Sequence, residues 1–147
     1  MGLLILLPIL FVGGCTGNAP GTSGLYLNGT GWTLTEYVSD GRSVQTLNGT
    51  AITMVFGGEG RITGSAGCNH YFASYDLKGT RITIGQAGST MMYCTGAGVM
   101  EQESAYLALL NQAASVSSAN DRLTFADAQG MTILSFAGIF AATLTLG

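Results

Sequence analysis

Glycine interrupts this chain so often that long helices are excluded over most of its length. There are 23 glycines among 147 residues, and glycine favours tight turns over the interiors of helices. Between the glycines, short runs alternate apolar and polar side chains, which is the pattern of a half-buried strand. One such run places Trp32, Leu34 and Val38 on one face and Tyr37 on the other. The sequence therefore predicts short strands joined by tight turns.

Further segments show the same pattern. An apolar row at Ile52, Met54 and Phe56 is followed by a glycine-rich turn, and Ile82 and Ile84 form another inward row. Strands are expected at residues 52–56, 61–64, 71–75, 81–84, 123–125 and 131–136, with the strand that contains Trp32 preceding them. Six or seven short strands in this order predict an antiparallel sheet.

Residues 99–114 break the alternation and have helical spacing instead. Apolar positions recur along one stripe, and Glu101 and Glu103 lie near its start, where the helix dipole favours negative charge. We therefore expect an α+β fold, in which a curved antiparallel β-sheet packs on a single α-helix.

The charge balance excludes two classes of protein. Charged residues make up 9% of the chain and hydrophobic residues 47%, a composition opposite to that of disordered chains. Only five lysines and arginines are present and the formal net charge is −3. A chain with no basic stripe has little to offer phosphates, so we expect no nucleic-acid partner.

The N-terminus has the features of an export signal. Residues 3–12 are almost entirely apolar, yet too short to cross a bilayer core of about 30 Å as a helix. The string Val12-Gly13-Gly14-Cys15 is similar to a lipobox, in which Cys15 receives a lipid and becomes the new N-terminus. We expect a signal segment at residues 1–14. An ordinary cleaved signal or an uncleaved apolar anchor remains an alternative.

Residues 15–24 continue the pattern expected of a tethered domain. After Cys15 they are small, proline or uncharged polar residues, the composition of a flexible linker. The expected location is the cell envelope, on the extracytoplasmic face of the membrane. The membrane would be a partner through the lipid anchor.

The middle of the chain resembles a known family. Gly67-Cys68-Asn69-His70-Tyr71 is the most specific string, and the helix around Glu103 also matches. The remaining matching segments are 27–34, 56–64, 90–94 and 123–125. These residues are similar to the META domain, the HslJ-like module of heat-shock lipoproteins, and the likeness covers residues 25–137. The apolar tail at 138–147 departs from the family pattern.

The resemblance carries implications for fold and function. It implies a partial barrel against one helix and fits an exported lipoprotein. The family is linked to heat shock and drug tolerance, without an agreed ligand or an established catalytic activity. We therefore expect no enzyme activity and no cofactor, and a binding or envelope-stress role with an unknown protein or small-molecule ligand.

The three cysteines divide into a single one and a pair. If Cys15 carries lipid, Cys68 and Cys94 form an even pair in an oxidising compartment, where a disulfide is expected. Two buried reduced thiols are the alternative. A further alternative adds His70, because two thiolates and an imidazole could hold Zn or Cu(I). The spacing lacks C-x-x-C and H-x-x-x-H, so no metal site is predicted.

Several polar residues near the pair call for a structural explanation. Asn69 in a bend with Gly67 suits a turn. Glu103 falls on the apolar stripe of the helix and must be paired or hydrogen-bonded there, and the backbone amides of the Gly67–Asn69 bend are the expected partners. With Tyr71 these residues form the predicted structural motif. The competing hypothesis is a cryptic hydrolase or metal-binding enzyme that uses Cys68, His70, Cys94 and Glu103.

Two other surface features remain open. Asn28 and Asn48 each begin an Asn-Gly-Thr sequence, which is both a turn signal and a glycosylation sequon. A concave sheet face is the expected binding surface, with the tyrosines Tyr37, Tyr71, Tyr75 and Tyr93.

Overall fold

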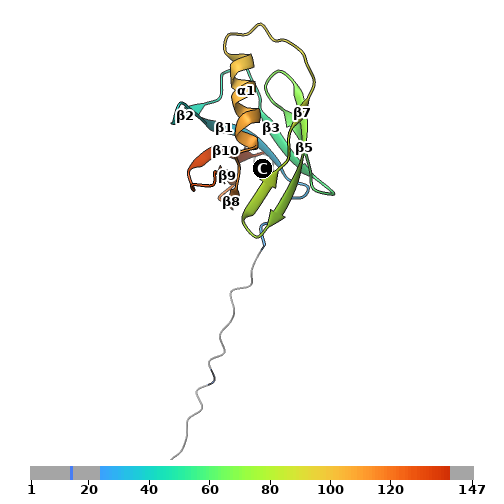
Figure 1. The fold of residues 1–147 in the computed structure, drawn as a ribbon, viewed down its shortest axis with the longest axis vertical. Helices are drawn as coiled ribbons and strands as arrows, with labels where there is room; N and C mark the ends of the chain where they lie inside the picture. Colours follow the sequence, from blue (N-terminus) through green and yellow to red (C-terminus); the bar gives the residue numbers. More distant parts are fainter. Residues whose placement is uncertain (1–13, 15–23, 140–147) are drawn as a thin grey trace, which may run out of the picture.

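A computed structural model of the chain describes residue 14 and residues 24–139 (Figure 1). Ten strands and one helix lie in these residues. The strands are β1 (Gly31–Ser39), β2 (Arg42–Gln45), β3 (Thr53–Gly57), β4 (Arg61–Ser65), β5 (His70–Lys78), β6 (Arg81–Ile84), β7 (Gly88–Ser89), β8 (Ser115–Ala119), β9 (Arg122–Ala126) and β10 (Thr132–Gly138). The helix α1 (Val99–Leu110) lies between β7 and β8 in the chain.

The strands close into an antiparallel barrel. The order β10-β9-β8-β6-β5-β4-β3-β1 returns on itself because β1 also pairs with β10, which makes a ring of eight. β2 and β7 lie outside the ring, paired with β1 and β5. The shortest strand pairing in the ring is that between β6 and β8, in which a single residue pair, Arg81 and Ser115, lies in register. An eight-stranded barrel has an interior that side chains can fill.

The interior is filled by the apolar rows of the strands. The predicted rows at residues 52–56 and 82–84 are buried, and α1 adds Tyr106 and Leu110 from one end. The fully buried set includes Ile52, Met54, Phe56, Ile62, Leu123, Phe125, Leu134 and Phe136. Strand alternation thus places one row of every major strand in a common core.

A β-bulge changes the faces of β1. The register against β10 shifts between Leu34 and Glu36, so Thr35 is an extra residue. Beyond the bulge the alternation is reversed, and Tyr37 lies opposite the buried Leu134. Tyr37 therefore packs against the core, where the sequence had placed it on the outer face. That expectation was wrong because strict alternation ignores an inserted residue.

The sequence Leu-Asn-Gly-Thr occurs twice and forms the same turn each time. The backbone N–H of Thr30 donates to the Leu27 carbonyl at 3.0 Å, and that of Thr50 donates to the Leu47 carbonyl at 3.2 Å. Each glycine has a φ near +80°, as the third position of a type II turn requires. Asn28 and Asn48 are exposed at these turns. The turn interpretation is confirmed, and glycosylation stays a prediction.

The helix is shorter than expected. We predicted residues 99–114, but α1 ends at Leu110. Ala114 already pairs with the sheet. Its N–H donates to the Ala126 carbonyl, and its carbonyl accepts from the Ile82 N–H. Pairing with the neighbouring strands prevails over the local helical spacing, and Ala113 remains buried without being helical.

The predicted barrel is confirmed, with two corrections. It is closed rather than partial, and the fold is mostly β rather than α+β, with ten strands where six or seven were expected. The additional strands give no apolar row: β2 is polar, β7 has two residues, and β8 is rich in serine. Their pairing comes from their neighbours and not from their own pattern.

Most of the predictions for the two ends of the chain concern residues that the structure does not describe. Residues 1–13 of the expected signal segment 1–14, residues 15–23 of the expected linker 15–24, which include Cys15, and residues 140–147 of the tail 138–147 lie outside the described residues. β10 extends to Gly138, one residue past the expected domain end at Ala137. None of the described helices has both the length and the apolarity to cross a bilayer.

Candidate binding site

The β4–β5 bend holds the carboxylate of Glu103. Gly67 has a φ of 110°, and this turns the next two backbone N–H groups in one direction. Cys68 and Asn69 both donate to Oε2 of Glu103, at 3.0 and 2.6 Å. Successive N–H groups of this kind form a small cavity for an anion. Here the chain's own carboxylate occupies it, with Glu103 only 5% exposed.

Asn69 extends the contact to the segment after β7. Its Nδ2 donates to Oε1 of Glu103 at 2.6 Å and to the Met92 carbonyl at 3.1 Å. Its Oδ1 accepts from the N–H of Met92 at 2.6 Å and from the hydroxyl of Thr90 at 2.9 Å. All four hydrogen-bonding positions of the amide are used. The buried Asn69 side chain therefore joins the bend, the helix and the segment 90–92.

A disulfide closes the same region. Cys68 and Cys94 are bonded, with their Cα atoms 5.9 Å apart and 26 positions apart in sequence. This is the expected pairing, and it leaves neither sulfur as a thiolate ligand or nucleophile. Among the residues that the structure describes, no group of three potential metal ligands is found.

The structure brings together most of the predicted motif. Gly67, Cys68, Asn69, Cys94 and Glu103 form one connected unit, and among the described residues none of its buried side-chain N or O atoms lacks a hydrogen-bond partner. His70 is exposed at the start of β5. Its backbone N–H donates a hydrogen bond to the Thr90 hydroxyl at 3.1 Å. The competing enzyme hypothesis loses two of its four groups to the disulfide.

Tyr71 lies below this unit, inside the barrel. Its hydroxyl donates to the Thr53 carbonyl at 2.9 Å and accepts from the hydroxyl of Tyr106 at 2.6 Å. Burial raises the pKa of both tyrosines above the ordinary value of 10.0, and the nearby Tyr71 raises that of Tyr106 further. The Tyr71 ring passes over Gly64, where a Cβ would overlap the Thr53 carbonyl oxygen.

The expected tyrosine surface does not exist as one face. Tyr71 is buried, Tyr37 and Tyr75 pack partly buried against the core, and Tyr93 is 79% exposed on a different segment. The concave face of the sheet is the filled interior of the barrel, because the ring is closed. A binding surface must therefore lie on the outside.

Two exposed features lie outside, next to each other. The first is a loop tip made of Met91, Met92 and Tyr93, which is fixed at its base by Asn69 and the disulfide. Met91 is 96% exposed. Methionine and tyrosine are enriched at protein interfaces. The tip is thus an apolar surface that the fold holds in place.

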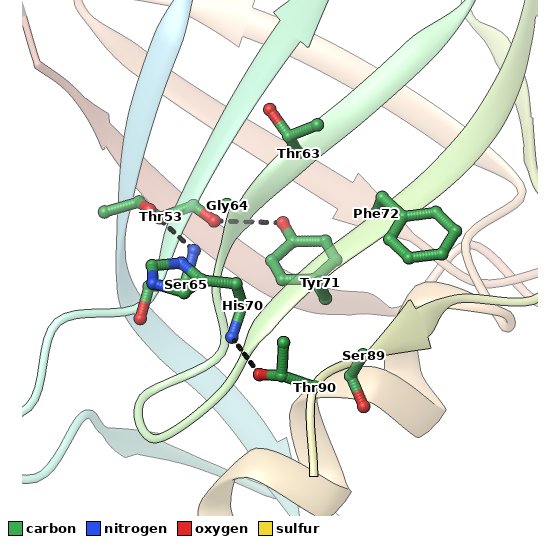
Figure 2. Close-up of a pocket in the computed structure, with 9 residues that line it drawn as sticks. All are labelled: Thr53, Thr63, Gly64, Ser65, His70, Tyr71, Phe72, Ser89 and Thr90. Carbon is green, nitrogen blue, oxygen red and sulfur yellow. Dashed lines mark hydrogen bonds between the residues drawn. The ribbon is translucent and has the colours of Figure 1, made fainter. Parts of the chain in front are cut away.

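The second feature is a groove of about 500 Å³ on the outer face of β4, β5 and β7. Figure 2 shows its lining residues, with the His70 and Phe72 rings pointing to opposite sides. The lining residues are Thr53, Thr63, Gly64, Ser65, His70, Tyr71, Phe72, Ser89 and Thr90. Ile62 and Ala73, which alternate with lining residues of β4 and β5, are buried, as an outward-facing groove requires.

Sequence reasoning missed one anchor, Gln102, and two of the three partners of the Asn69 side chain, Thr90 and Met92. Gln102 is buried beside Glu103 and holds the β2–β3 loop: its Oε1 accepts from the Leu47 N–H at 2.7 Å and its Nε2 donates to Thr50 at 3.0 Å. A polar residue directly before the predicted Glu103 anchor was the available signal. Thr90 and Met92 gave none, because their partner lies more than 20 residues away.

Comparison with known proteins identifies this arrangement. The family model of the META domain matches residues 26–138. The chain belongs to the META domain family. No curated protein sequence matches it.

Solved structures resemble this META domain across most of its length. An NMR structure of a protein from Burkholderia xenovorans is 27% identical, with a TM-score of 0.63, and the match covers 76% of this chain and 83% of that one. A crystal structure of a DUF4847 family protein from Bacteroides vulgatus is 14% identical, with a TM-score of 0.55 and coverage of 76% and 93%. The second likeness concerns the fold alone.

Proposed function

We propose that this META domain protein is a non-enzymatic lipoprotein of the cell envelope, anchored through Cys15 on the extracytoplasmic face and acting by binding in an envelope-stress role. The observation that carries the proposal is the Cys68–Cys94 disulfide. Disulfides persist in oxidising compartments and are rare in reducing ones. The pair fits an exported chain whose remaining cysteine, Cys15, follows an apolar segment.

The direction of the chain supports an exposed binding surface. The N–H of Gly29 donates to the Phe56 carbonyl near the end of β3. The start of the domain therefore lies at the end of the barrel that carries the turn between β3 and β4. The disulfide and α1 lie at the other end of that hairpin, beside Thr53 and the β4–β5 bend. Figure 1 shows α1 at the opposite end of the domain from the start of the segment 24–139. A tether at Cys15 would leave the Met91–Tyr93 tip directed away from the membrane.

The site chemistry supports binding over catalysis. Both sulfurs are bonded to each other, and both oxygens of Glu103 accept hydrogen bonds from the β4–β5 bend. These groups act on the fold and not on a substrate. The two outward features, the loop tip and the groove, are open to a partner.

Fractionation of cells that express the full chain or Cys15→Ala tests this proposal. We expect the wild-type chain in the membrane fraction and accessible to protease from the extracytoplasmic side, and the variant released or left unprocessed. Crosslinked pull-down from the anchored form should then recover a partner that Met91→Ser and Tyr93→Ser variants recover less well. Equal membrane association of wild type and Cys15→Ala would contradict the anchor.

A further inference from the structure

The groove beside Phe72 has features that its place in the barrel does not require. Phe72 alternates with buried residues and points outward, yet it is an aromatic residue with 61% of its surface exposed. It adds nothing to the core. An exposed apolar ring in a sheet becomes informative when its neighbours form a shaped surface around it.

The ring is held in position by a glycine on the neighbouring strand. Gly88 of β7 lies opposite Phe72 in register. A Cβ on Gly88 would come within 2.5 Å of the Phe72 ring, so the ring packs directly on the β7 backbone. A ligand that stacks on this ring would not have to order it first, and preorganisation of this kind favours affinity.

Hydroxyl groups surround the ring on one side. Five of the residues that line the 500 Å³ groove are serine or threonine, and His70 is the titratable side chain among them apart from the buried Tyr71. No lysine, arginine, aspartate or glutamate lines this groove. Hydroxyl groups both donate and accept hydrogen bonds. The lining therefore suits a neutral, polyhydroxylated ligand, and it carries no carboxylate, ammonium or guanidinium group to pair with an ion.

A second groove continues on the other side of the same ring. It has a volume of about 370 Å³ and is lined by Glu59, Gly60, Arg61, Phe72, Ala73, Ser74 and Gln86. Its two charged residues have opposite sign, so its formal charge is also balanced. Phe72 lies in both linings, and the two grooves together form a track across β4 and β5 with an aromatic ring at its centre.

From this track we infer that the outer face of β4, β5 and β7 binds a neutral oligosaccharide, with one sugar ring stacked on Phe72 and its neighbours hydrogen-bonded on either side. The apolar face of a sugar ring matches an aromatic ring, and its hydroxyl groups match those of Thr63 and Ser65. Both groove volumes fall in the usual range for small-ligand sites, about 300–1,000 Å³. The inference names a ligand for the proposed binding function and rests on it.

The test uses the full chain in a detergent without a sugar headgroup. Isothermal titration calorimetry is run with cellohexaose, maltohexaose and chitohexaose as neutral probes, dextran sulfate as an anionic probe, and a neutral alanine-serine peptide. We expect at least one neutral oligosaccharide to bind, with an affinity that changes less than twofold when salt is raised. Binding to dextran sulfate or to the peptide in its place would overturn the inference.

Variants locate the site. Phe72→Val removes the ring and puts a β-branched residue, which suits a strand, in its place, and we expect at least a tenfold loss of affinity. Thr63→Val removes one hydroxyl without changing the shape, and a loss of several-fold is expected. Tyr26→Ala removes an exposed aromatic ring outside the groove and should bind as the wild type does. Circular dichroism and an intact disulfide confirm that each variant is folded.

The failures are distinguishable. If none of the neutral oligosaccharides binds, or if Phe72→Val binds as well as the wild type, the saccharide inference is wrong, and the anchoring at Cys15 is unaffected because it is measured in cells. If Cys15→Ala fractionates as the wild type does while the purified chain still binds saccharide, the anchor is wrong and the groove assignment stands.

Discussion

Replacing Glu103 by glutamine should destabilise the protein substantially while changing its shape very little. The Glu103 carboxylate accepts three hydrogen bonds in a buried site, two from backbone N–H groups and one from Asn69 Nδ2. A glutamine in the same place has one oxygen and one NH₂ group. Whichever way it is turned, at least one donor of the β4–β5 bend then faces another donor.

Asn69 cannot relieve this conflict by turning over. Its Oδ1 already accepts from the Met92 N–H and the Thr90 hydroxyl, and a flip would exchange that acceptor for a donor. A hydrogen bond to a charged group contributes about 1.5–3 kcal/mol, and a buried donor without a partner costs about 1–3 kcal/mol. We therefore expect Glu103→Gln to lower the free energy of unfolding by about 2–4 kcal/mol.

Urea unfolding of the disulfide-bonded protein at neutral pH measures this change in the free energy of unfolding. With a slope in the usual range of about 1–3 kcal/mol per molar urea, the midpoint should fall by roughly 1–2 M. Glu101→Gln is the matched control, because Glu101 lies two residues before Glu103, in the first turn of α1, but is exposed. Its effect should stay within about 0.5 kcal/mol. Equal midpoints for Glu103→Gln and the wild type would refute the anchoring role of the carboxylate.

Three further perturbations have defined outcomes. Cys68→Ser should lower the free energy of unfolding by about 3.5 kcal/mol, which is the chain-entropy value for a loop of this length. In calorimetry this corresponds to a fall in Tm of roughly 10–20 °C. An unchanged Tm would show that the disulfide does not stabilise the fold. Gly64→Ala should lower the free energy of unfolding by at least about 1–3 kcal/mol, because the new Cβ would overlap the Thr53 carbonyl oxygen. In the control Gly58→Ala the new Cβ meets nothing within 4 Å, so the free energy of unfolding should hardly change. Equal urea midpoints for the two variants would contradict the close packing at Gly64. Because the folded pKa values of Tyr71 and Tyr106 are raised, their contribution to stability is complete below pH 10 and is lost as the pH rises further, by about 1.4 kcal/mol per pH unit for each tyrosine. Urea midpoints measured across the alkaline range should show this fall, and a Tyr106→Phe variant should show a shallower one.

Strand alternation was sufficient to predict the core, because burial of one face repeats every second residue. The rows at Ile52–Phe56 and Ile82–Ile84 are buried as expected. The same rule failed at Tyr37, where an inserted residue in β1 reverses the faces. It also could not predict closure, since the pairing of β1 with β10 joins segments about 100 residues apart and leaves no local signal.

The site was predictable only where a residue conflicted with its surroundings. A carboxylate on the apolar stripe of a helix demanded a partner, and the bend at Gly67 provides it. The disulfide followed from an even pair of cysteines. The groove around Phe72 left no such conflict, because an exposed aromatic residue in an alternating strand looks like an ordinary β-sheet residue. Its meaning depends on the register that places Gly88 and Thr63 beside it.

The most direct test of the envelope assignment is the mass of the N-terminal peptide of the protein extracted from membranes. If Cys15 anchors the protein, this peptide begins at Cys15 and carries a diacylglyceryl group, with residues 1–14 removed. Cys68 and Cys94 of the same chain are bridged under non-reducing conditions. An unmodified peptide that retains residues 1–15, together with free thiols at Cys68 and Cys94, would contradict it.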